Sequence, residues 1–145
     1  MTLEEKQRSL IEDYSLIEDP TERFTAIVDL GRKAPPYPEP ERTEAHLVPG
    51  CTSRVWLTGW LEEGTGESLC QFRVDSETPS VHGVAALLCA LYSGAPPAEV
   101  AAVEPEVLTA LGIDRHLTPT RRRGLGNVRR RIRELAESLA AAGSS

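Results

Sequence analysis

The chain has 145 residues, of which 40% are hydrophobic and 26% charged, a balance typical of a globular protein. This length favours one domain covering residues 1–145. No apolar run approaches the roughly 20 residues of a membrane-spanning helix, and the polar, acidic start from Met1 to Glu5 is unlike a signal peptide. These features exclude an integral membrane protein and predict a soluble, cytoplasmic one.

The net charge of −6 is unevenly distributed along the chain. Residues 121–145 contain seven Arg and two Glu, a local charge of +5, so residues 1–120 carry −11. Non-specific nucleic-acid binding requires a basic face without competing carboxylates. The distribution therefore favours a protein partner over nucleic acid.

Hydrophobic periodicity predicts two helices at the start of the chain. The first is expected over residues 3–17, where apolar side chains recur on one face. The second is expected from Pro20, because Asp19 can cap it and proline fits the first helical position. Four prolines between residues 34 and 43 then predict an extended surface loop.

Two strands are expected after this loop. Residues 54–61 are rich in β-branched and aromatic side chains, and residues 69–74 alternate apolar with polar ones. The polar, glycine-containing segment 62–66 between them predicts a turn. Together these segments predict an antiparallel hairpin.

The rest of the chain is predicted to be helical. Residues 80–93 read as a buried helix, and a short helix is expected around residues 105–111. The last helix is expected over residues 119–142, with its regular part beginning only near residue 125 because two glycines weaken its first turns. The order of helices, sheet and helices indicates an α+β fold with a small antiparallel sheet packed with helices.

The three cysteines leave at least one thiol unpaired, and free thiols are the expectation without a secretory signal. Cys89 lies in the apolar helix, and Cys70 alternates with Phe72 and Val74 on the second strand. Both are therefore predicted to be buried core thiols.

Cys51 has a different setting, because it follows Pro49 and Gly50 at a turn just before a strand. Such a turn is expected to be exposed and mobile, so its thiol can reach into a partner's site. Backbone donors near Gly50 and the hydroxyls of Thr52 and Ser53 are candidates to stabilise a thiolate. From residue types alone, a reactive thiol and an incidental loop cysteine are equally open.

The segment Val48-Pro49-Gly50-Cys51-Thr52-Ser53-Arg54-Val55-Trp56-Leu57 resembles the signature of the SufE family of sulfur acceptors. That signature is a Gly-Cys with a small or polar pair, followed by a Val-Trp strand. Three more blocks resemble family segments in the same order and together span nearly the whole chain: Phe24 to Gly31, Asp75-Ser76 with Val81-His82-Gly83-Val84, and His116-Leu117-Thr118-Pro119-Thr120-Arg121 with Gly124-Leu125.

The resemblance implies a single α+β domain shared with cluster-scaffold proteins, and a persulfide carrier rather than an enzyme. The implied partner is a cysteine desulfurase, whose pyridoxal phosphate makes a persulfide from cysteine. The SufE-type thiol stimulates the desulfurase, takes its terminal sulfur and carries it to an iron–sulfur scaffold complex. The carrier itself needs no cofactor. We expect the loop to shelter such a persulfide against Val48, Val55 and Leu57.

The matching blocks also assign candidate site residues. Cys51 is implied to be the acceptor, and Arg121 to position the cysteine loop or the partner. His116 and Asp75 match as well. Arg122 and Arg123 extend a run that is more basic than the family pattern, so partner docking and simple solvation are both open for them.

Two alternatives from other classes remain. An iron–sulfur or zinc scaffold would use Cys51, Cys70, Cys89 and either His82 or His46, but the cysteines are 19 residues apart and form no C-x-x-C pair. A plain interaction domain would need no thiol chemistry. No Ser-His-Asp spacing, phosphate-binding loop or paired-carboxylate motif indicates a conventional enzyme.

Overall fold

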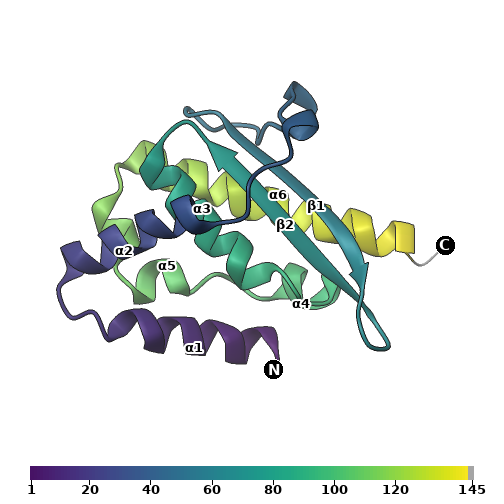
Figure 1. The fold of residues 1–145 in the computed structure, drawn as a ribbon, viewed down its shortest axis with the longest axis horizontal. Helices are drawn as coiled ribbons and strands as arrows, with labels where there is room; N and C mark the ends of the chain where they lie inside the picture. Colours follow the sequence, from purple (N-terminus) through teal and green to yellow (C-terminus); the bar gives the residue numbers. More distant parts are fainter. Residues whose placement is uncertain (144–145) are drawn as a thin grey trace.

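The computed structural model describes residues 1–143 as helices around one two-stranded antiparallel sheet, which confirms the predicted α+β fold (Figure 1). In chain order, the elements are α1 (Leu3–Ser15), α2 (Pro20–Lys33), the 3-10 helices η1 (Glu39–Glu41) and η2 (Glu44–His46), β1 (Val55–Glu63), β2 (Ser68–Ser76), α3 (Pro79–Tyr92), α4 (Pro97–Ala102), α5 (Val107–Ala110), the 3-10 helix η3 (Ile113–His116) and α6 (Pro119–Gly143). Within residues 1–143, no helix combines the length and apolarity needed to cross a membrane.

The sheet is the predicted hairpin, with Val55 paired to Ser76 at one end. Because side chains alternate along a strand, Val55, Leu57 and Phe72 share the face that is buried against the helices. Trp56 points to the other face and is buried as well. The guanidinium carbons of Arg42 and Arg54 lie 5.7 Å and 5.3 Å from the centroid of its ring.

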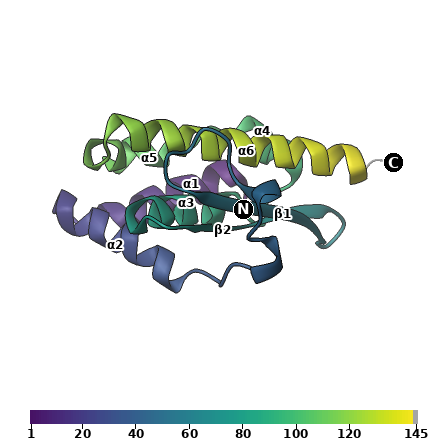
Figure 2. The same cartoon turned by 90° about the horizontal axis from the view of Figure 1, so that it is seen from above.

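Helix α3 is the centre of the core, as its apolar sequence predicts. It packs against α2, β2 and α6, and most of its residues are buried. Figure 2 shows α6 along one side of the molecule and α2 along the other, with α3 and the sheet between them. Helix α6 also packs against β1, which brings it close to the loop that leads into the sheet.

Helices α2 and α3 approach each other closely at two glycines. A Cβ atom on Gly83 would lie 2.5 Å from the Cα atom of Val28, and one on Gly31 would lie 3.1 Å from the Cα atom of Gly83. A methyl group at residue 83 would overlap the backbone of α2, and one at residue 31 would make an unusually tight contact with α3. The contact gives a packing reason for the glycines in two of the blocks that resemble SufE proteins.

The prediction that the last helix becomes regular only near residue 125 is wrong. Helix α6 is regular from Pro119, and the Arg121 amide donates a hydrogen bond of 3.2 Å to the hydroxyl of Thr118 at its start. Leu125 and Val128 are buried about one and two turns later. The cap and this burial outweigh the helix-weakening effect of the two glycines.

One helix end and one additional short helix also differ from the prediction. The first helix ends at Ser15 rather than at residue 17. Helix α4 lies outside the predicted helices, because Pro96 and Pro97 also suit the end of the preceding helix. Proline also suits the first turn of a new helix, and that is its role here.

One arginine of α6 belongs to the core rather than to the charged surface. Arg129 is only 6% exposed, and its guanidinium carbon lies 4.6 Å from the centroid of the Tyr92 ring. Its Nη2 donates to the carbonyl oxygens of Ala101 at 3.3 Å and Val103 at 2.9 Å. Arg129 therefore joins α6 to the end of α4 and is not available to a partner.

Candidate functional site

Cys51 lies in the loop 47–54, just before β1. The ends of the loop are joined because the Val48 amide donates a 2.8 Å hydrogen bond to the Val55 carbonyl. Between them, Gly50 has a φ of +81°, a left-handed conformation that favours glycine. The resulting tight turn brings Cys51 against the first part of α6, toward which the loop reaches in Figure 2.

The Cys51 thiol is half-buried at the edge of the core. Its Sγ atom donates a hydrogen bond of 3.3 Å to the carbonyl oxygen of Gly124 in α6. Beside it is a hollow of about 20 Å³, which has room for about one water-sized group. The hollow is lined by Cys51, Thr52, Ser53, Val55, Val81, Thr120, Arg121 and Gly124.

This setting differs from the exposed turn expected for Cys51. Burial raises the pKa of the Cys51 thiol, and the Gly124 carbonyl accepts the thiol hydrogen but would repel a thiolate. The hydroxyl of Ser53, expected to stabilise a thiolate, instead shares a 2.7 Å hydrogen bond with the hydroxyl of Thr78. Of the expected shelter residues, Val55 lines the hollow. The closed loop therefore holds a neutral thiol.

The other two cysteines are core residues. Cys70 is 0% exposed on β2 and Cys89 is 6% exposed on α3. Burial raises the pKa of Cys70 to about 11 and the pKa of Cys89 to about 12. All three thiols are free and lie on separate elements. Within residues 1–143, no three His, Cys, Asp or Glu side chains come together as a possible metal site.

The arginine run lies at the start of α6, beside the hollow. Arg121 lines the hollow, and its Nη1 donates to the hydroxyl of Ser80 at 3.3 Å. Arg122 donates to the Asp114 carbonyl at 3.2 Å. The side chains of Arg121, Arg122 and Arg123 are all exposed. The first turn of α6, which begins beside the hollow, therefore exposes three positive charges.

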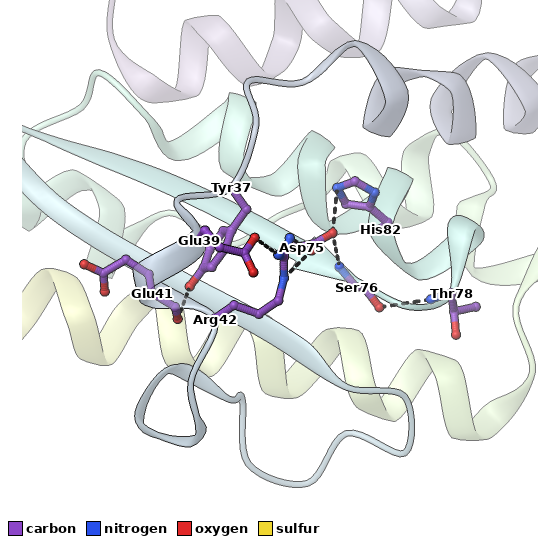
Figure 3. A network of polar contacts seen from close by, with 8 residues as sticks. All are labelled: Tyr37, Glu39, Glu41, Arg42, Asp75, Ser76, Thr78 and His82. Atoms are coloured by element: carbon purple, nitrogen blue, oxygen red, sulfur yellow. Dashed lines mark hydrogen bonds and ion pairs between the residues drawn. The ribbon is translucent and has the colours of Figure 1, made fainter.

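Asp75 belongs to a neighbouring network rather than to the hollow (Figure 3). It forms an ion pair with Arg42, whose Nε lies 3.0 Å from the Asp75 carboxylate. The Nε2 atom of His82 is 4.0 Å from the same carboxylate. This network ties the segment before the cysteine loop to β2.

His116 also lies outside the lining of the hollow. It ends η3, and its ring stacks on Phe24 of α2 with 4.8 Å between the ring centroids. Of the five partner-side candidates from the sequence, Arg121 alone lines the hollow with Cys51.

Two residues of α6 contact the loop without having been predicted to do so. Gly124 accepts the thiol hydrogen of Cys51, and Asn127 donates from Nδ2 to the Gly50 carbonyl at 3.1 Å. Gly124 lies in a block that resembles the family, but that resemblance does not indicate its contact. Asn127 carries no sequence signal, because it is a single polar residue in a charged helix.

Comparisons with known proteins agree on the kind of protein this is. The family model described as "SufE: Fe-S metabolism associated domain" matches residues 8–136. An uncharacterised SufE-like protein of Rhizobium etli is 34% identical over 92% of this chain and 90% of its own. A SufE-like protein of Arabidopsis thaliana, described as chloroplastic/mitochondrial, is 26% identical over 92% of this chain and 35% of its own.

A solved structure shares the fold. The solution structure of a hypothetical protein from Thermus thermophilus superposes with a TM-score of 0.73 at 24% identity, covering 94% of this chain and 96% of that one. The family match spans the cysteine loop, the sheet and most of α6. The chain therefore belongs to the SufE family, whose domain is associated with iron–sulfur metabolism.

Proposed function

We propose that this protein is a persulfide carrier, in which Cys51 accepts sulfur from a cysteine desulfurase and passes it to an iron–sulfur scaffold complex. The observation that carries the proposal is the placement of the three thiols. Cys70 and Cys89 are enclosed in the core, whereas Cys51 is half-exposed on a loop beside a basic helix end. A thiol on a loop can enter another protein's active site, and a core thiol cannot.

The proposed step is a thiol–disulfide type of exchange. The Cys51 sulfur attacks the terminal sulfur of the desulfurase persulfide, and a new S–S bond forms on Cys51. The S–S bond within the donor breaks, and the desulfurase cysteine leaves as a thiolate. The proton lost by Cys51 ends on that cysteine. No oxidant, metal or cofactor of the carrier is involved, and pyridoxal phosphate belongs to the desulfurase.

The resting geometry supports a carrier that is inactive until it meets its partner. With its pKa raised by burial and its hydrogen donated to the Gly124 carbonyl, Cys51 is a poor nucleophile in the closed loop. Transfer then requires the loop to open. After transfer, closing the loop returns the sulfur to the hollow, whose small size restricts access of reductants and oxidants.

The charge around Cys51 supports a protein partner with an acidic surface. Arg121 lines the hollow beside Cys51, and Arg122 and Arg123 follow it on the exposed first turn of α6. Electrostatic attraction raises the rate of encounter between proteins. In this proposal Arg121 is the closest to the reacting thiol. Asp75 and His116 instead stabilise the fold. Asp75 pairs with Arg42, and His116 stacks on Phe24.

The experiment compares alanine formation by a cysteine desulfurase with wild-type protein and with Cys51→Ser. Wild-type protein should stimulate turnover and Cys51→Ser should not, because a serine hydroxyl cannot form the S–S bond. Equal stimulation by both would contradict the proposal. The alternative scaffold function predicts instead that purified protein contains iron or zinc, which replacement of Cys51 would remove.

A further inference from the structure

One turn of α6 holds two consecutive residues of the cysteine loop. The Gly124 carbonyl accepts the thiol hydrogen of Cys51 at 3.3 Å, and the Asn127 side chain donates to the Gly50 carbonyl at 3.1 Å. Gly124 and Asn127 are three residues apart, so they lie on the same face of the helix. The two hydrogen bonds therefore act on the loop from the same side.

The contact at Gly50 is close as well as polar. A Cβ atom on Gly50 would lie 2.7 Å from Nδ2 of Asn127, and the φ of +81° already disfavours a side chain there. The loop can thus approach α6 closely enough for the hydrogen bond because residue 50 is glycine. Asn127 is half-buried by this contact, although it lies on an otherwise charged helix.

We propose that Asn127 is a positioning residue that latches the loop 47–54 in its closed form and releases it for sulfur transfer. Cys51 can move away from α6 only if the neighbouring Gly50 carbonyl also leaves the Asn127 amide. The hydrogen bond of the thiol is lost on ionisation or persulfide formation, whereas the Asn127 bond is not. Asn127 can therefore hold the loop closed both before and after Cys51 carries the extra sulfur. This inference rests on the proposed function.

The latch predicts a specific change in the reactivity of Cys51. Asn127→Asp keeps the size of the side chain but replaces the donating amide with a carboxylate, and Asn127→Ala removes the group. Each should raise the rate of Cys51 alkylation by iodoacetamide about two- to tenfold, the effect of one hydrogen bond on the opening equilibrium. Cys70 and Cys89 serve as internal references, because they report global opening of the core.

Gly126→Ala is the matched control. It neighbours Asn127 on α6, it is exposed, and an added Cβ atom would meet nothing within 4 Å. It should leave the Cys51 rate unchanged. The inference is contradicted if Cys51 in both Asn127 variants reacts at the wild-type rate, or if all three cysteines accelerate together.

The test separates the latch from the proposed function, because alkylation requires no partner. A second measurement, sulfur uptake from a desulfurase by wild-type protein, addresses the function alone. Faster Cys51 alkylation in the Asn127 variants without sulfur uptake by wild type would support the latch and overturn the proposed function. Normal sulfur uptake by wild type, together with wild-type alkylation rates in the Asn127 variants, would support the proposed function and overturn the latch.

Discussion

The thiol of Cys51 links the chemistry of a single residue to the position of its loop. Burial raises its pKa, so the closed loop binds the thiol proton more tightly than an open loop with an ordinary thiol pKa of about 8.5. The closed form is therefore fully stabilised below that ordinary pKa. The closed form loses this stabilisation as the pH rises from the ordinary thiol pKa toward the raised pKa of Cys51 in the closed loop.

This linkage predicts the pH dependence of Cys51 alkylation. The rate in the folded protein should keep rising at pH values where a peptide of residues 48–54 has already reached its plateau. Cys70 and Cys89 should react more slowly than Cys51 throughout, because both are enclosed. A Cys51 profile that overlays the peptide profile, or equal rates for the three cysteines, would contradict this account.

The sequence predicts only part of the site. The Pro-Gly setting of Cys51 predicts a loop position that distinguishes it from the two core thiols, because turn preferences are local. The two residues of α6 that hold the loop, Gly124 and Asn127, are 73 and 77 residues away from their partners in the chain. No local pattern encodes contacts at that separation. The half-buried state of the thiol was therefore not predicted from its polar neighbours.

At the scale of elements, α2 and α3 make a close backbone contact at Gly83. We predict that Gly83→Ala lowers the free energy of unfolding by about 1–3 kcal/mol, since its methyl group would overlap the backbone at Val28. Gly126→Ala on exposed α6 should instead raise it by about 0.5–1 kcal/mol. Urea denaturation of both variants measures the difference. A Gly83→Ala protein as stable as wild type would disprove this contact.

The elements themselves were largely predictable from local signals. The hairpin follows from alternation and a polar turn, and both strands lie within two residues of their predicted ends. The start of α6 at Pro119 was predicted, but its regularity before residue 125 was not, because that depends on burial of Leu125 against the rest of the core. Helix α4 was missed because proline both ends and begins helices.

At the scale of the whole molecule, the uneven charge distribution leads to a docking prediction. Within residues 1–143, Arg123 has no hydrogen bond or ion pair of its side chain, so reversing its charge breaks no internal contact. Arg123→Glu should reduce desulfurase stimulation several-fold at low salt. The difference from wild type should shrink as salt screens the attraction.

Arg8→Glu is the control for net charge. It makes the same change on α1, which lies on the opposite side of the molecule from the start of β1 in Figure 1. Stimulation should be close to wild type in this variant. Equal weakening by Arg8→Glu and Arg123→Glu would show that net charge matters and that the start of α6 is not a docking surface. Reversal of Arg121, Arg122 and Arg123 together should weaken stimulation further.

The most direct measurement for the central proposal is the intact mass of the protein after incubation with a cysteine desulfurase and free cysteine. Wild-type protein should gain one sulfur atom that a reductant removes, and Cys51→Ser should gain none. The variant should still fold, because replacing one half-exposed sulfur removes little packing. A reductant-labile sulfur on Cys51→Ser, mapped to Cys70 or Cys89, would contradict the account.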